Sequence, residues 1–195
     1  MTNSTIGYTG FFWLLFFTLS TFAQPGRDSA ILSLNGTWEI IFDHKNEGKK
    51  SSWHTDDGFE KHPSKQDILV PSCWEEVEKD YEGVAFYRCK FTVPGDWEGK
   101  TAELEFDAVN YLTEVWINDQ VVGFHEGGFT PFTFRVDRLI RPGEENTLTL
   151  RVVGPILLTD NDIDGMGRME VPQWRGAITG GIWQPVTLKS SGKAL

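Results

Sequence analysis

Basic residues, long apolar runs and helical periodicity are all scarce in this chain of 195 residues. It holds 18 Lys and Arg against 28 Asp and Glu, which gives a formal net charge of -10. Nucleic acid and anionic membrane surfaces repel a chain this acidic, so neither is expected as a partner. The chain also lacks an internal repeat, and no stretch keeps a helical period.

The strongest apolar run is too short to cross a membrane. Phe11–Phe22 has about the length of a signal-peptide core. Thr21-Phe22-Ala23 has the small residues of a cleavage site, so we expect a signal peptide at 1–23 and one mature domain at 24–195. We therefore predict a secreted or periplasmic protein without membrane contact after cleavage. Met1–Gly10 has no Lys or Arg, and an uncleaved N-terminal anchor is the alternative.

Cysteine is rare as well, with two residues, Cys73 and Cys89. They could pair in an oxidising compartment. Cys89, however, shares the alternation of a strand whose other members are apolar, which points it into a core, where a thiol behaves as a small hydrophobic group. We favour two free, structural cysteines over a disulfide.

Because no helical period is present, the main signal is the alternation of apolar and polar residues with a period of two. In Leu104–Val136 and the residues just before it, Ala102, Leu104 and Phe106 alternate with glutamates. Asn118-Asp119 suits a tight hairpin turn, and Gly127-Gly128 suits a sharp corner. Further strand patterns occur at 37–42, 86–93, 146–153 and 183–189. Short strands between turns predict an all-β fold, a two-sheet antiparallel sandwich.

Two long segments lack such patterns. Asp43–Gln66 is polar and is expected to be a surface connection with room for a short helical turn. Gly154–Ile182 is the longest unpatterned loop. The strand aromatics are expected in the core rather than at a ligand: Trp38, Phe91, Phe106 and Trp116.

Seven phrases in chain order carry a family resemblance. They are LNGTW (34–38), VPSCWE (70–75), FYRCKFTVP (86–94), VWIN (115–118), GFHEGGFTPF (123–132), PGEENTL (142–148) and GGIWQPV (180–186). In this order they resemble the N-terminal sugar-binding domain of glycoside hydrolase family 2, which includes β-galactosidases, β-glucuronidases and β-mannosidases. The resemblance implies a jelly-roll sandwich of the galactose-binding-domain type.

The resemblance also implies what surrounds such a domain. Complete enzymes of the family continue into an immunoglobulin-like domain and a TIM barrel, whose two glutamates perform retaining hydrolysis. Those downstream domains and a β-linked carbohydrate are the implied partners. No catalytic residue is expected in this chain, and Asn46-Glu47, although similar to the family's acid/base dipeptide, lies in a Lys-rich loop without barrel context.

The resemblance implies that two loops reach the active-site mouth. The first, Asp80–Gly83, offers Tyr81 and Glu82. The second, Glu170–Arg175, offers four candidates: Glu170, Gln173, Trp174 and Arg175. Carboxylates and amides bind sugar hydroxyls, and aromatic rings stack on pyranose faces. The alternative for each residue is ordinary solvated surface. His125 and Glu126, beside the glycine corner, are expected to be turn or rim residues.

One acidic segment has part of the pattern of a metal-binding loop. Asp160, Asp162 and Asp164 alternate and precede Gly165, like the start of a calcium loop. Val171 stands where the bidentate acid belongs, so an acidic loop without cofactor is favoured.

Three functions follow from these observations. The first is the accessory domain of a secreted β-glycosidase, inactive on its own. The second is a free-standing carbohydrate-binding module, and the third is a purely structural or adhesion sandwich.

Overall fold

Two antiparallel sheets face each other and make up almost the whole fold. The computed structural model describes residues 29–156, 163–164 and 179–193. Its elements are β1 (Ala30–Ser33), β2 (Gly36–Asp43), α1 (Asp56–Glu60), β3 (Gln66–Val70), η1 (Trp74–Glu76), β4 (Val84–Thr92), η2 (Gly95–Trp97), β5 (Lys100–Phe106), β6 (Leu112–Ile117), β7 (Gln120–Glu126), β8 (Phe132–Arg135), β9 (Glu145–Val153) and β10 (Val186–Lys193).

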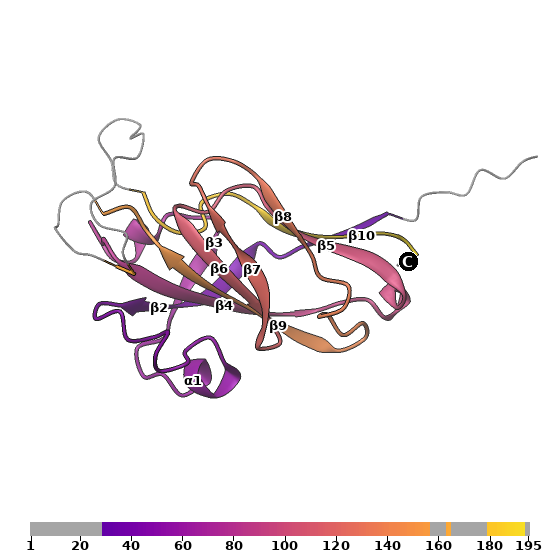
Figure 1. The fold of residues 1–195 in the computed structure, drawn as a ribbon, viewed down its shortest axis with the longest axis horizontal. Helices are drawn as coiled ribbons and strands as arrows, with labels where there is room; N and C mark the ends of the chain where they lie inside the picture. Colours follow the sequence, from indigo (N-terminus) through magenta and orange to yellow (C-terminus); the bar gives the residue numbers. More distant parts are fainter. Residues whose placement is uncertain (1–28, 157–162, 165–178, 194–195) are drawn as a thin grey trace, which may run out of the picture.

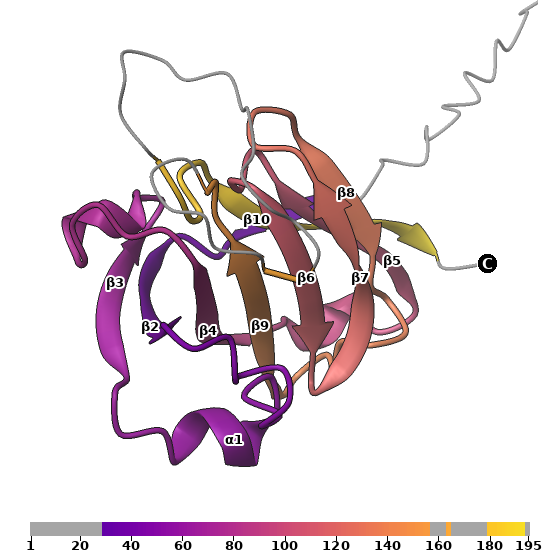
Figure 2. The ribbon, with the colours of Figure 1, turned by 60° about the vertical axis from the view of Figure 1, so that its left-hand side comes forward.

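The strands divide into a smaller and a larger sheet. The four-stranded sheet has the order β1-β10-β5-β8, and the six-stranded sheet has the order β3-β2-β4-β9-β6-β7. The two sheets lie one over the other in Figure 1, and Figure 2 shows the six strands side by side with α1 next to them. The predicted all-β, two-sheet antiparallel sandwich is confirmed. Within the described residues, no helix is long and apolar enough to span a bilayer.

Alternation builds the main core between the sheets. On β5, Ala102, Leu104 and Phe106 are buried, while Glu103 and Glu105 point outward, as the sequence predicts. The predicted core positions Trp38 and Phe91 belong to the same cluster. Both cysteines are free thiols, as favoured.

The predicted turns also form where expected. Asn118 and Asp119 join β6 to β7 with φ angles of 49° and 64°, the left-handed region that a tight hairpin of this type needs. Gly127 has a φ of 139° at the predicted corner.

Asp43–Gln66 is a mostly exposed surface connection, as the sequence predicts. The segment contains a short helix, α1, and it also covers the outer face of the six-stranded sheet and closes a second apolar cluster. Phe59 of α1 is fully buried there against Ile41 and Phe86 of the sheet. The buried Phe59 side chain contributes apolar contact area that helps to hold this mostly polar segment on the sheet. The small number of apolar residues in the segment does not predict this contact.

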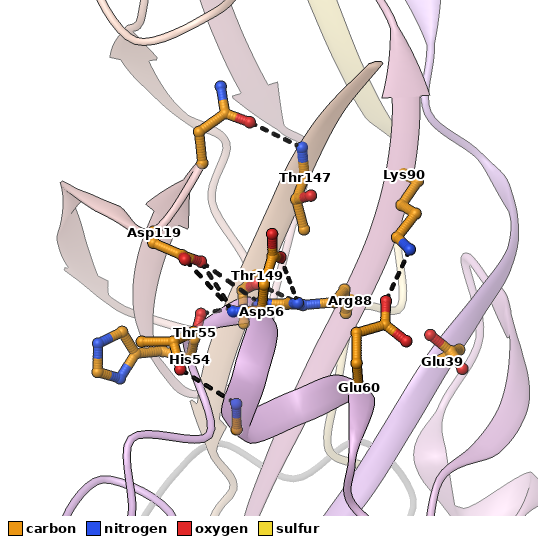
Figure 3. A network of polar contacts seen from close by, with 12 residues as sticks. Glu39, His54, Thr55, Asp56, Glu60, Arg88, Lys90, Asp119, Thr147 and Thr149 are labelled. Carbon is orange, nitrogen blue, oxygen red and sulfur yellow. Dashed lines mark hydrogen bonds and ion pairs between the residues drawn. The ribbon is translucent and has the colours of Figure 1, made fainter.

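Arg88 of β4 fixes this cover to the sheet (Figure 3). Its guanidinium donates to Asp56 Oδ1 at 2.7 Å, to the His54 carbonyl at 2.9 Å and to Thr149 Oγ1 at 3.0 Å. It also lies 4.8 Å from the centre of the Phe59 ring. The side chain of Arg88 is fully buried, so sheet and cover share one enclosed cation.

A second buried arginine repeats the arrangement one strand away. Arg151 of β9 donates to Glu114 at 2.7 Å, to Asn46 at 2.9 Å and to Asp164 at 2.6 Å. Trp116 is buried, as expected. It lies on the outer face of the sheet, where its ring stacks on His54 of the cover with 4.9 Å between the ring centres. Both faces of β9 are therefore covered.

Replacing Arg88 should loosen the cover before it unfolds the sandwich. Arg88→Met keeps an apolar stem but removes the three hydrogen bonds, and Asp56 stays hydrated because it is 65% exposed. We expect a loss of about 2 kcal/mol in the free energy of unfolding, measured with urea, and faster tryptic cleavage at Lys45, Lys49 or Lys50.

The matched control is Lys61→Met, which breaks an exposed i,i+4 pair with Asp57. It should change stability by less than about 0.5 kcal/mol. Unchanged cleavage in Arg88→Met would show that the guanidinium does not hold the cover.

Candidate functional site

Trp74 organises the end of the sandwich where β4 begins and β9 ends. Its side chain is fully buried. A Cβ added to Gly154 would come within 2.3 Å of the indole, and one added to Gly180 within 2.1 Å. These two glycines flank the loop that was predicted to carry Glu170–Arg175. Trp74 therefore fixes where the chain leaves the sandwich and where it returns.

Tyr81 lies beside Trp74 in the core rather than on the surface. Its hydroxyl donates to the Val84 carbonyl at 2.7 Å and accepts from the Val84 N–H at 3.1 Å. Its ring packs edge-on against Phe42 at 4.8 Å and against Trp74 at 5.3 Å. The ring is consequently not open for stacking on a sugar in this structure, and its expected role in binding stays a prediction.

The other predicted binding residues are divided between described and undescribed parts of the chain. Glu82 is half-buried next to Tyr81. The four candidates of the second loop lie outside the described residues: Glu170, Gln173, Trp174 and Arg175. The structure therefore brings the two loop bases together at one end of the sandwich, through Trp74.

Glu75 adds a half-buried carboxylate to this end, and one of its oxygens, Oε2, is fully buried. Its Oε1 accepts a hydrogen bond from the backbone N–H of Gly180 at 2.9 Å, and the backbone N–H of Trp74 donates to the Gly180 carbonyl at 3.1 Å. Burial raises the pKa of the Glu75 carboxyl above its usual value. Its Oε2 and the Tyr87 hydroxyl are both buried without a hydrogen-bond partner among the described residues.

Asn110 ties the glycine corner to the returning chain. Its backbone N–H and carbonyl each pair with Gly181 at 3.0 Å, and its Nδ2 donates to the Thr179 carbonyl. A Cβ on Gly128 would come within 2.1 Å of Asn110 Oδ1, so only glycine fits there. The Trp183 indole in turn donates to the Gly128 carbonyl at 2.8 Å.

An aromatic pair lies open on this corner. Phe129 is 47% exposed, and its ring meets half-buried Trp183 edge-on at 5.6 Å. On the same corner, the Tyr111 hydroxyl donates to Glu126 Oε1 at 3.0 Å. Rings that can stack on a pyranose and a carboxylate that can bind hydroxyls are the chemistry of a sugar-binding surface. We name these four residues the corner surface.

Sequence reasoning missed most of the corner surface. It placed Glu126 at the rim of a structural corner and did not consider Tyr111, Phe129 or Trp183 as binding residues. The signal available for Phe129 is its position directly after the predicted Gly127-Gly128 corner. Trp183 stands where the long unpatterned loop meets a predicted strand, and Tyr111 has no comparable signal. His125, the other rim residue, is instead stacked on Phe132 at 4.0 Å, and burial lowers its pKa.

One residue of the acidic segment that resembles a calcium loop, Asp164, is among the described residues. Asp164 is 2.6 Å from the Arg151 guanidinium, and Asn46 Nδ2 donates to its other oxygen at 3.2 Å. Its carboxylate is thus used in an ion pair, while Asp160 and Asp162 lie outside the described residues. Asn46 serves the same network, which gives the Asn46-Glu47 dipeptide a structural role.

The half-buried carboxyl of Glu75 predicts a pH dependence. Between the ordinary carboxyl pKa and the raised one, the folded state binds the proton more often than the unfolded state. The contribution of Glu75 to the free energy of unfolding therefore falls as pH rises through that window. Glu75→Gln has no such proton, so we expect it to gain stability relative to the wild type as pH rises above the ordinary carboxyl range, measured in urea titrations.

Glu76→Gln is the matched control, because it removes the same charge from an exposed neighbour. An equal gain in both variants would contradict a specific effect of burial at Glu75.

Comparisons with known proteins agree with the fold and with the order of the sequence phrases. A family model described as "Glycosyl hydrolases family 2, sugar binding domain" matches residues 77–190. A β-glucuronidase of Paenibacillus borealis is 31% identical over 130 residues, which cover 63% of this chain and 21% of that protein. A β-galactosidase of Thermoanaerobacter pseudethanolicus is 32% identical over 120 residues, 61% of this chain and 14% of that protein.

Solved structures show the same fold. The β-glucuronidase of Ruminococcus gnavus superposes with a TM-score of 0.71 at 23% identity, over 86% of this chain and 30% of that one. The chain thus spans about a fifth of the length of the Paenibacillus relative and under a third of the solved neighbour. On the strength of the family match, this chain belongs to glycosyl hydrolase family 2 and contains that family's sugar-binding domain.

Proposed function

We propose that this domain is the secreted N-terminal part of a retaining β-glycosidase and binds β-linked carbohydrate at the end of the sandwich organised by Trp74. Its second task is to buttress downstream immunoglobulin-like and TIM-barrel domains, which would hold the two catalytic glutamates. The relatives are β-glucuronidases and β-galactosidases several times longer than the matched region, which supports this division of labour.

The corner surface is the observation that carries the binding proposal. Phe129 and Trp183 are aromatic, and Phe129 is 47% exposed. Glu126, held by Tyr111, adds a hydroxyl-binding group at the end of β7, directly before the glycine corner. This surface adjoins the base of the loop with the sequence-predicted candidates, so both sets would contact the same ligand.

Binding is tested by titrating β-linked disaccharides into the chain and following heat or intrinsic fluorescence. Phe129→Ala should weaken affinity about fivefold or more, because an aromatic contact of this kind contributes about 1 kcal/mol beyond the buried area. Phe124→Ala is the control, since Phe124 is 70% exposed on β7 and is not part of the corner surface.

If both variants lost the same sugar affinity, the loss would come from removing any exposed apolar side chain, and the proposal would be contradicted. The same result would favour the structural sandwich among the three functions. Hydrolysis of chromogenic β-glycosides by the chain alone would contradict an accessory role.

A free-standing carbohydrate-binding module is the alternative proposal. It shares the corner surface but needs no downstream domain. The reading frame beyond Leu195 separates the two proposals: an accessory domain is followed by a barrel sequence with two glutamates, and a free-standing module is followed by a stop codon.

Secretion has its own test. If 1–23 is a signal peptide, the exported protein begins at Gln24, and mass spectrometry of periplasm or medium should find that N-terminus. Export with Met1 retained would favour the anchor instead.

A further inference from the structure

The turn between β1 and β2 presents an asparagine directly before a glycine, and both residues are exposed. They are Asn35 and Gly36. Asn35 Oδ1 accepts a hydrogen bond from the backbone N–H of Val186, the first residue of β10, at 2.9 Å. Asn35 Nδ2 donates no hydrogen bond to any residue that the structure describes. One end of the side-chain amide is therefore held by the fold, and the other end is free in solvent.

The free Nδ2 group distinguishes Asn35 from the other asparagines in the described part of the chain. In each of those, Nδ2 donates at least one hydrogen bond, and the residue that follows carries a side chain. They are Asn46, Asn110, Asn118 and Asn146. Asparagine is one of the chemically labile residues of proteins. At Asn35 the amide nitrogen can leave as ammonia without first losing a hydrogen bond to the protein.

Gly36 supplies a backbone nitrogen that can reach the side chain of Asn35. Its φ angle is 141°, a conformation that favours glycine, and a Cβ built on it would meet no atom within 4 Å. Gly36 also pairs with Val70 at the last position of the ladder between β2 and β3. The ends of elements open more easily than their middles, so this nitrogen can move toward Asn35 Cγ at low cost.

The Val186 N–H lies where it would assist an attack on Asn35 Cγ. Such an attack moves negative charge onto Oδ1, and a fixed N–H donor at that oxygen stabilises the charge. The donor is already at 2.9 Å from Oδ1. It is held there because the backbone N–H of Leu34 donates to the Val186 carbonyl, also at 2.9 Å. The fold therefore favours the reaction at this amide.

We propose that Asn35 is a modification site, at which the folded chain converts this asparagine to aspartate and isoaspartate. The Gly36 nitrogen gives its proton to water and bonds to Asn35 Cγ. The bond from Cγ to Nδ2 breaks, and Nδ2 takes up a proton and leaves as ammonia. Water then opens the resulting succinimide ring. Opening at Cγ gives aspartate, and opening at the main-chain carbonyl carbon gives isoaspartate.

Both products change the turn in ways that can be measured. Each adds one negative charge beside Val186, which separates the modified chain from the unmodified chain by ion exchange. Isoaspartate also lengthens the main chain by one carbon between Leu34, which is bonded to Val186, and Gly36, which is paired with Val70. The modification involves no residue of the corner surface, so it stands whether or not the domain binds sugar there.

The test is to incubate the chain at mildly alkaline pH, folded and, in parallel, unfolded in urea. Peptide mapping by mass spectrometry follows each asparagine, and isoaspartyl methyltransferase identifies isoaspartate. Asn35 should convert at least as fast in the folded chain as in the unfolded chain, because the Val186 N–H is in place only when the chain is folded. Asn46 and Asn118, whose Nδ2 groups are hydrogen-bonded, should stay unmodified in the folded chain.

Gly36→Ala tests which atom attacks. Its methyl group hinders the backbone nitrogen, so the conversion should slow in the unfolded chain, where any effect of the variant on folding plays no part. An unchanged rate would mean that water attacks the amide directly and would overturn the proposed route.

The folded chain gives the decisive comparison. Slower conversion of Asn35 in the folded chain than in the unfolded chain would show that the fold protects the amide, and it would overturn the proposal. Conversion of Asn46 or Asn118 at the rate of Asn35 in the folded chain would also overturn it, since the free Nδ2 and the adjacent glycine would then make no difference.

Discussion

The close packing of one indole against two glycine backbones is the constraint on which the functional end depends. Trp74 fills the space that side chains at Gly154 and Gly180 would occupy, so three chain segments meet without room for a Cβ. Tyr81 and Phe42 close the cluster from the loop side. Packing this tight tolerates little change in volume, so the loop bases are held in one geometry. The corner surface and Glu75 are arranged around that fixed point.

The six-stranded sheet shows how the rest of the chain supports this end. Its inner face joins the main core, and its outer face is covered by the segment around α1, which Arg88 holds through an ion pair with Asp56 and Arg151 holds through a hydrogen bond to Asn46. Buried guanidinium groups cost desolvation energy, which their hydrogen bonds to carboxylates and carbonyls offset. The result is a sheet with both faces covered.

Much of this fold could be predicted from the sequence, because alternation and turn chemistry are local signals. The inward positions of β5, the hairpin at Asn118-Asp119 and the glycine corner all follow from neighbouring residues. The cover over the outer face could not be predicted, since it depends on Phe59 and Arg88 meeting across 29 residues of chain, and neither position carries a local signal for that contact. The burial of Tyr81 has the same origin: a polar loop places it, but Phe42 and Trp74 bury it.

The candidate site was predictable only in outline. Family resemblance nominates loop residues near the end organised by Trp74, and it does not nominate the exposed Phe129–Trp183 pair that the glycine corner presents. In that pair, the Trp183 indole donates a hydrogen bond to the Gly128 carbonyl, and Gly128 in turn packs closely against Asn110. Three segments that are distant in the sequence therefore meet there.

A crystal structure of the chain with a bound β-linked disaccharide tests the central claim most directly. The account predicts a sugar ring against Phe129 and Trp183, with a hydroxyl on Glu126, at the end organised by Trp74. Electron density for the disaccharide elsewhere on the domain, with the corner surface bare, would contradict it.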